Sequence, residues 1–151
     1  METICATGIR VSELRYITLE AVSRGQAEIR MKGKLRTIII PGKLAKKLKK
    51  YAKAQKIGSG VLFVTRTGKP VPRRQIWAEM KAICEKAGVP AEKVFPHNLR
   101  HLFAQTFYRV SHDIVHLADV LGHSNVETTR IYLISTGAEH RREMERLGLV
   151  V

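Results

Sequence analysis

This 151-residue sequence contains little cysteine, no long apolar run and few acidic residues. Its two cysteines, Cys5 and Cys84, cannot form a disulfide framework and lack the spacing of a metal site. Two reduced thiols are typical of a cytoplasmic protein, which is the location we expect. No apolar run approaches the roughly 20 residues that cross a bilayer, and no signal peptide opens the chain. We therefore expect no membrane association.

The shortage of acidic residues gives the chain a strongly basic balance. Lysine and arginine number 27 against 13 aspartates and glutamates, a formal net charge of +14. Such an excess of positive charge favours binding to a polyanion. Double-stranded DNA is the partner that we expect, because the sequence has no amphipathic terminal anchor for an acidic membrane surface.

Apolar periodicity predicts one compact, mainly helical α+β domain with small β-hairpins, and 151 residues suffice for one core. We expect helices over 43–56, 72–87 and 97–110, a helix capped by Ser111 that ends at Gly122, and a charged helical tail over 137–146. Ser124 and Glu127 have the spacing of a capping box for a helix that carries Tyr132. Strands are expected over 27–31 and 36–40, on either side of a lysine-bearing turn, with a short strand over 61–64.

The first arginine of interest follows the Thr7-Gly8 turn. Residues 9–17 place apolar side chains on one helical stripe, and Arg10 lies on or beside it. A guanidinium in that position needs a partner, and Glu13, three residues later, is the nearest carboxylate. The pair predicts either a structural ion pair or a guanidinium held ready for phosphate.

A metal site is the chemical alternative to a DNA site. Four histidines form two pairs with i, i+4 spacing: His97/His101 and His112/His116. Asn98, however, stands where a zinc hydrolase has its glutamate, and Arg100 places a fixed positive charge beside the first pair. We therefore expect no metal, and structural or surface roles for His101, His112 and His116.

Six residues occur along the chain in the order arginine, hairpin lysine, His-x-x-Arg, Gly-His and tyrosine. They are Arg10 in ATGIRVSEL, Lys32 in MKGK, His97 and Arg100 in PHNLRH, His123 in VLGH, and Tyr132. Each motif alone is weak, but their order resembles the active-site set of the tyrosine recombinases, the phage integrase family. The resemblance extends over nearly the whole chain and implies that family's catalytic-domain fold.

The resemblance also implies a role for each residue. Arg10 and Arg100 would stabilise the charge on the scissile phosphate, to which paired N–H donors are suited. Tyr132 would be the nucleophile, and it needs help because the pKa of tyrosine is about 10. His97 would act as acid/base and His123 would donate to the phosphate. The hairpin lysine, Lys32 or alternatively Lys34, would protonate the leaving 5′-oxygen.

The implied product is a 3′-phosphotyrosine on DNA with a free 5′-hydroxyl, made without metal, ATP or another cofactor. Further DNA contacts are expected from the hairpin residues Lys34 and Arg36. Arg73 and Arg74 are expected to bind phosphate, because cations in the first turn of a helix oppose its dipole and need another reason to be there.

By the same resemblance, residues 1–151 would be a catalytic domain that is truncated on its N-terminal side, since only nine residues precede Arg10. The family's DNA-clamping domain would be absent, and full-length members would assemble as tetramers on two DNA sites. A non-catalytic DNA-binding module of this fold, or a nicking and relaxing activity like that of type IB topoisomerases, stays open. So do the target sequence, the direction of recombination, and whether the C-terminal tail docks on its own or a neighbouring protomer.

Overall fold

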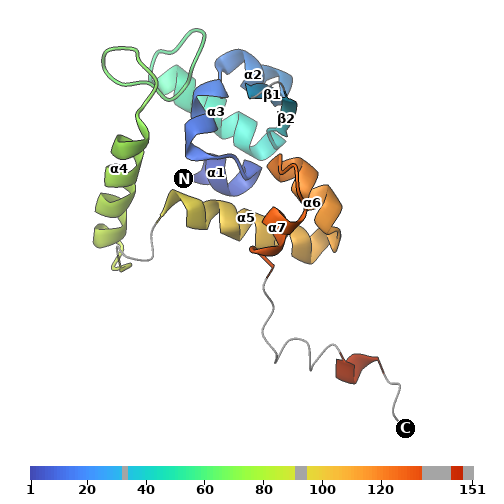
Figure 1. The fold of residues 1–151 in the computed structure, drawn as a ribbon. Coiled ribbons are helices and arrows are strands. Elements are labelled where there is room, and N and C mark those ends of the chain that lie inside the picture. Colours follow the sequence, from blue (N-terminus) through green and yellow to red (C-terminus); the bar gives the residue numbers. More distant parts are fainter. Residues whose placement is uncertain (32–33, 91–94, 134–143, 148–151) are drawn as a thin grey trace.

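Helices make up most of the regular structure in the described part of the chain, with an antiparallel hairpin packed among them (Figure 1). The computed structural model describes residues 1–31, 34–90, 95–133 and 144–147. The elements are α1 (Glu2–Thr7), the 3-10 helix η1 (Val11–Tyr16), α2 (Leu19–Arg24), β1 (Gln26–Met31), β2 (Lys34–Ile39), α3 (Gly42–Ala54), α4 (Arg73–Lys86), α5 (Pro96–Ser111), α6 (Ile114–Leu121) and α7 (Glu127–Arg130). The predicted mainly helical fold with a hairpin is confirmed.

The hairpin packs its apolar side against the N-terminal helices. Ala27, Ile29 and Ile38 are buried, whereas Glu28, Thr37 and Ile39 are exposed, as the two-residue period of a strand requires. The ladder runs from the Gln26–Ile39 pair at one end to the Met31–Lys34 pair at the other.

The predicted helix over 43–56 is α3. Leu44, Leu48 and Ala52 are buried at four-residue intervals, in a helix that packs against α1 and α2. The lysines lie on the other faces of the helix, as expected of a solvated surface. The strand predicted over 61–64 exists only as two isolated bridges, one to Thr18 and one to Pro70.

The long helix α5 carries the His-x-x-Arg motif across the molecule, packed on α1 and α6. It starts with Pro96, whose fixed φ and missing N–H suit the first turn. It continues through Ser111, so the prediction that Ser111 caps the next helix is wrong. Asp113 is the cap of α6, and its Oδ1 accepts from the amides of Val115 and His116.

The helix predicted to carry Tyr132 is shorter than expected. No Ser124 capping box forms: Asn125 Oδ1 accepts from the Glu127 amide instead, and the Glu127 carboxylate pairs with Arg130. Helix α7 ends at Arg130, and Tyr132 lies in the following turn, with its amide donating to the Thr129 carbonyl at 3.0 Å. Sequence spacing alone could not predict whether the Ser124 or the Asn125 side chain would accept from the Glu127 amide.

The stripe over residues 9–17 also differs from its prediction in one respect, because it forms the 3-10 helix η1 and not an α-helix. Most of the predicted 137–146 helix falls outside the described residues. Within the described part of the chain, no helix is long and apolar enough to cross a membrane.

The turn after α6 depends on a glycine, which yields a first prediction. Gly122 has φ +67°, and a Cβ there would overlap Cδ of Arg36, a side chain held at its far end by hydrogen bonds. We expect Gly122→Ala to lower the free energy of unfolding by about 2–4 kcal/mol, combining left-handed strain with overpacking.

Gly25 is the matched control. It ends α2 with φ +76°, but a Cβ there would meet nothing within 4 Å. Gly25→Ala should therefore cost only about 1 kcal/mol. Urea denaturation of the two variants measures the difference, and equal losses would show that the contact with Arg36 is unimportant.

Candidate active site

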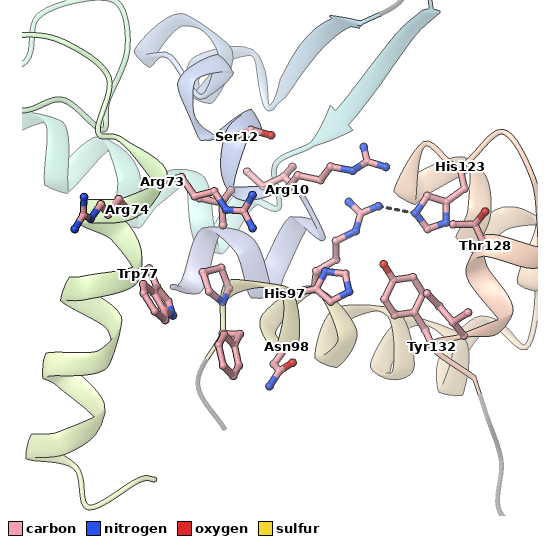
Figure 2. Close-up of a pocket in the computed structure, with 16 residues that line it drawn as sticks. Arg10, Ser12, Arg73, Arg74, Trp77, His97, Asn98, His123, Thr128 and Tyr132 are labelled. Atoms are coloured by element: carbon pink, nitrogen blue, oxygen red, sulfur yellow. Dashed lines mark hydrogen bonds between the residues drawn. The ribbon is translucent and has the colours of Figure 1, made fainter. Parts of the chain in front are cut away.

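Residues from both halves of the chain line a pocket of about 1020 Å³ between η1, α4, α5 and the α6–α7 region (Figure 2). Five of the six residues predicted as catalytic are in its lining: Arg10, His97, Arg100, His123 and Tyr132. Arg73 and Arg74 contribute from α4, so four arginines line the pocket and no carboxylate is among its described lining residues. The positive charge of the pocket is suited to an anionic ligand.

Arg10 is oriented by Glu13, as the sequence suggested. Its backbone amide donates to Glu13 Oε2 at 2.7 Å, and its guanidinium donates to Oε1 at 3.0 Å. Glu13 is only 1% exposed, whereas the Arg10 side chain keeps 40% of its surface. The carboxylate thus anchors Arg10 from inside and leaves its remaining N–H donors available to the pocket.

Arg36 shares the same carboxylate from the opposite side. Its Nη1 donates to both Glu13 oxygens at 3.2 Å, and its Nε donates to the Val120 carbonyl at 3.1 Å. With 11% of its side chain exposed, Arg36 is largely covered, and burial lowers its pKa while Glu13 opposes the shift. It therefore joins β2 to η1 and α6; direct contact with DNA by this residue stays a prediction.

Arg100 is held by main-chain oxygens. It is 2% exposed, and its guanidinium donates to the carbonyl of Gly8, just after α1, and to that of Leu121, the last residue of α6, at 2.9 Å. Carbonyls at helix C-termini have no intrahelical partner and carry partial negative charge. Burial lowers the pKa of Arg100, and the nearby Tyr132 hydroxyl opposes this shift. A guanidinium nonetheless stays charged at any working pH.

His123 is wedged between Arg100 and Thr129. Its Nε2 lies 2.9 Å from Arg100 Nη2, and its Nδ1 lies 2.8 Å from Thr129 Oγ1. A guanidinium can only donate, so Nε2 accepts and Nδ1 carries the proton that is donated to Thr129. The ring is therefore neutral in this arrangement. Donation from Nε2 to a phosphate would require Arg100 to release this bond and Nε2 to be protonated.

Electrostatics agree with this tautomer. Burial and the positive charges of Arg100, Arg10 and Arg36 lower the pKa of His123 to about 4. Thr129, which is fully buried, was not predicted as a site residue. The only signal available in the sequence was its position six residues after the histidine, at the start of a helix.

Tyr132 lies among three imidazoles. The ring centroid of His101 is 4.3 Å from that of Tyr132, and those of His97 and His123 are each 5.9 Å away. The tyrosine is 4% exposed, and its hydroxyl points into the space near His97 and the Arg100–His123 pair (Figure 2). His101, expected to be structural or on the surface, is thus in direct contact with the predicted nucleophile.

The α4 side of the pocket holds Arg73 and Arg74 in the first helical turn, where they were predicted to bind phosphate. The ring of Trp77 on α4 stacks on that of Phe95, just before α5, with centroids 6.3 Å apart. The two arginines line the same pocket as Pro96 and His97 at the start of α5. Phosphate binding by them stays a prediction.

The structure gives little information on the two hairpin lysines. Lys32 lies outside the described residues, and Lys34 is described only as the first residue of β2. Among the described residues, no group of three or more potential ligands is arranged to hold a metal. The His97 and His101 rings meet edge to face, with centroids 4.6 Å apart.

The sequence matches a known family over most of its length. The phage integrase family model matches residues 1–139. The tyrosine recombinase XerA of Pyrococcus furiosus is 33% identical, over 95% of this chain and 52% of its own length. The tyrosine recombinase XerD of Staphylococcus saprophyticus is also 33% identical, over 87% of this chain and 48% of its own. The chain therefore spans about half the length of these relatives.

Solved structures agree with the fold. The crystal structure of XerA recombinase superposes with a TM-score of 0.79 at 26% identity, covering 99% of this chain and 55% of that one. The XerH site-specific recombinase, solved bound to its difH substrate before cleavage, gives 0.74 at 25% identity, covering 97% and 43%.

The state of His123 leads to a prediction about pH. The folded-state pKa of about 4 lies below the value of about 6.5 expected in the unfolded chain, so between these values the unfolded chain binds a proton that the folded chain does not. The contribution of His123 to the free energy of unfolding should thus be constant above about pH 6.5 and decrease as the pH drops toward about 4.

His123→Gln removes this titration. The free energy of unfolding of wild type, relative to that of the variant, should therefore decrease as the pH falls from about 6.5 to about 4. Nitrogen-15 NMR of the ring should show a protonated Nδ1 and no titration above pH 5. A His123 that titrates near pH 6.5 would contradict the arrangement with Arg100.

Proposed function

Because this chain belongs to the phage integrase family, we propose that it is the catalytic domain of a site-specific tyrosine recombinase, with Tyr132 as its nucleophile. The observation that carries the proposal is the convergence on one cationic pocket of five residues from positions 10 to 132, in the family's order. A DNA phosphodiester is the ligand that matches a pocket lined by four arginines, and XerH, a site-specific recombinase with a similar structure, is bound to its difH substrate.

The arginines are suited to stabilise the transition state. Negative charge on the non-bridging oxygens grows as the nucleophile attacks, and preorganised donors aimed at it lower the barrier. Arg100 is already fixed by two carbonyls, and Arg10 is fixed by Glu13 with donors to spare. Arg10 therefore keeps its position when the phosphate arrives, and an N–H of Arg100 becomes available when its bond to His123 Nε2 is released.

The proposed step exchanges one ester for another. Tyr132 Oη forms a bond to phosphorus as the bond from phosphorus to the 5′-oxygen breaks. The phenol proton passes to a base, for which His97 is the candidate, and Lys32 supplies a proton to the departing 5′-oxygen. The products are a 3′-phosphotyrosine and a free 5′-hydroxyl. The energy of the phosphodiester is conserved, so no ATP is required.

Tyr132→Phe tests the nucleophile. We expect this variant to lose covalent attachment to a nicked suicide DNA substrate completely while its affinity for DNA stays within about twofold, since the pocket's cations are unchanged. Denaturing gels measure the attachment, and peptide mapping of the wild-type adduct identifies the residue. Tyr108→Phe is the matched control, because Tyr108 also packs against helix α6 but lies outside the pocket lining. Adducts that persist in Tyr132→Phe would refute the assignment. DNA binding without any adduct in the wild type would favour a non-catalytic module.

A sulfur-substituted substrate tests the proposed acid. If Lys32 protonates the leaving oxygen, Lys32→Ala should be slow on ordinary DNA but recover on a 5′-bridging phosphorothiolate, whose thiolate leaves without a proton. Arg10→Ala should not recover, because its role is charge stabilisation. Rescue confined to Lys34→Ala would transfer the role to that lysine, and EDTA should change none of these rates.

A further inference from the structure

The orientation of Tyr132 cannot come from its backbone alone. The residue lies beyond the end of the four-residue helix α7, and its amide makes one hydrogen bond, to Thr129. A side chain on such a turn retains rotamer freedom unless neighbouring groups remove it. Yet Tyr132 is only 4% exposed, so packing against other elements determines where its hydroxyl points.

The closest aromatic neighbour of that ring is His101. Its centroid is 4.3 Å from the phenol centroid with the planes at 67°, whereas the rings of His97 and His123 are each 5.9 Å away. His101 is itself fixed, because it lies one turn after His97 on α5 and meets that ring edge to face at 4.6 Å. It belongs to a long helix held against α1 and α6, so its position is more rigid than that of the turn.

We infer that His101 is a positioning residue for Tyr132: its ring, fixed on α5, packs edge to face on the phenol and holds the hydroxyl toward His97 and Arg100. The packing itself does not depend on the proposed function; only its effect on the rate of DNA attachment rests on that proposal. The packing requires a flat aromatic ring, and it does not require a ring nitrogen. Edge-to-face pairs of this kind contribute beyond the area that they bury.

The neutral form of His101 suits this role. Burial is the main cause that lowers the pKa of His101 below its usual value, and the charges of His97 and Arg100 lower it further. A neutral ring adds no charge to a region that already contains several guanidiniums. A phenylalanine ring should therefore substitute for the imidazole, and alanine should not.

The kinetic test compares two substitutions at this position. At saturating suicide DNA, we expect His101→Ala to lower the single-turnover rate of covalent attachment by roughly ten- to a hundredfold through misplacement of the nucleophile. Its DNA affinity should stay within about twofold of wild type, because no phosphate-facing arginine changes. His101→Phe should restore most of the rate. A wild-type rate in His101→Ala, or a rate in His101→Phe as low as in His101→Ala, would overturn the inference; the latter would mean that the imidazole nitrogens are needed.

His116→Ala is the matched control. The His116 ring also meets an aromatic ring edge to face on this part of the fold, Phe107 at 5.2 Å, but it lies outside the pocket lining. It should attach to DNA at the wild-type rate. A loss equal to that of His101→Ala would show that any such contact matters only for general stability, and would overturn the inference.

A second readout needs no activity. In protein labelled with 3-fluorotyrosine, the Tyr132 fluorine signal is identified by its loss in Tyr132→Phe. We expect this signal to be displaced from the random-coil position in wild type and in His101→Phe, and to approach that position in His101→Ala. An unchanged signal in His101→Ala would overturn the positioning role. If wild type forms no adduct, the proposed function fails, while the fluorine signal still decides whether His101 orients the phenol.

Discussion

The buried carboxylate of Glu13 is the interaction on which the rest of the site depends. It accepts from the Arg10 amide, from the Arg10 guanidinium and from Arg36, and it is 1% exposed. An isolated buried carboxylate would be strongly unfavourable, and so would the neighbouring guanidiniums without it. Because Arg36 continues to the Val120 carbonyl, one carboxylate links η1, β2 and the end of α6. Its removal would leave two cations repelling each other beside a third, so the cost would exceed that of a single lost ion pair.

The buried charge of Arg100 is stabilised by main-chain carbonyls, where Arg10 and Arg36 use a carboxylate. Its guanidinium bonds to the carbonyls of Gly8 and Leu121, the groups that the ends of α1 and α6 leave without partners. The turns at the ends of α1 and α6 both require a glycine. Gly8 and Gly122 have positive φ, and a Cβ at Gly8 would overlap the Phe103 ring. The two turns thus serve the arginine as well as the helices. This explains why a catalytic candidate that is almost completely buried can remain charged.

The sequence predicted the parts of this site that depend on short spacing. The proximity of Arg10 to Glu13, and the helix that carries both His97 and Arg100, follow from local periodicity. Arg36 could not be placed in the same way, because its partner Val120 is 84 residues away. Its place in the hairpin suggested contact with DNA, whereas tertiary packing covers most of its side chain. His101 was likewise assigned to the surface or the core, since periodicity shows which face of α5 it shares but not that a tyrosine from a later turn packs there.

The distribution of exposure among the arginines indicates how the pocket can meet a phosphate without rearranging its base. Arg36 and Arg100 are covered and have protein acceptors, so they define the positions of the surrounding segments. Arg10 keeps 40% of its side-chain surface, and Arg73 and Arg74 approach from α4 across the pocket. Donors that are fixed on one side and open on the other stabilise developing charge without the cost of reorganising water or protein. Tyr132, the proposed nucleophile, is the exception to this rigidity, because it follows a four-residue helix. The position of its hydroxyl must therefore come from the side chains around it, the three imidazoles and the Arg100 guanidinium, and substitutions among the imidazoles should separate DNA affinity from the rate of reaction.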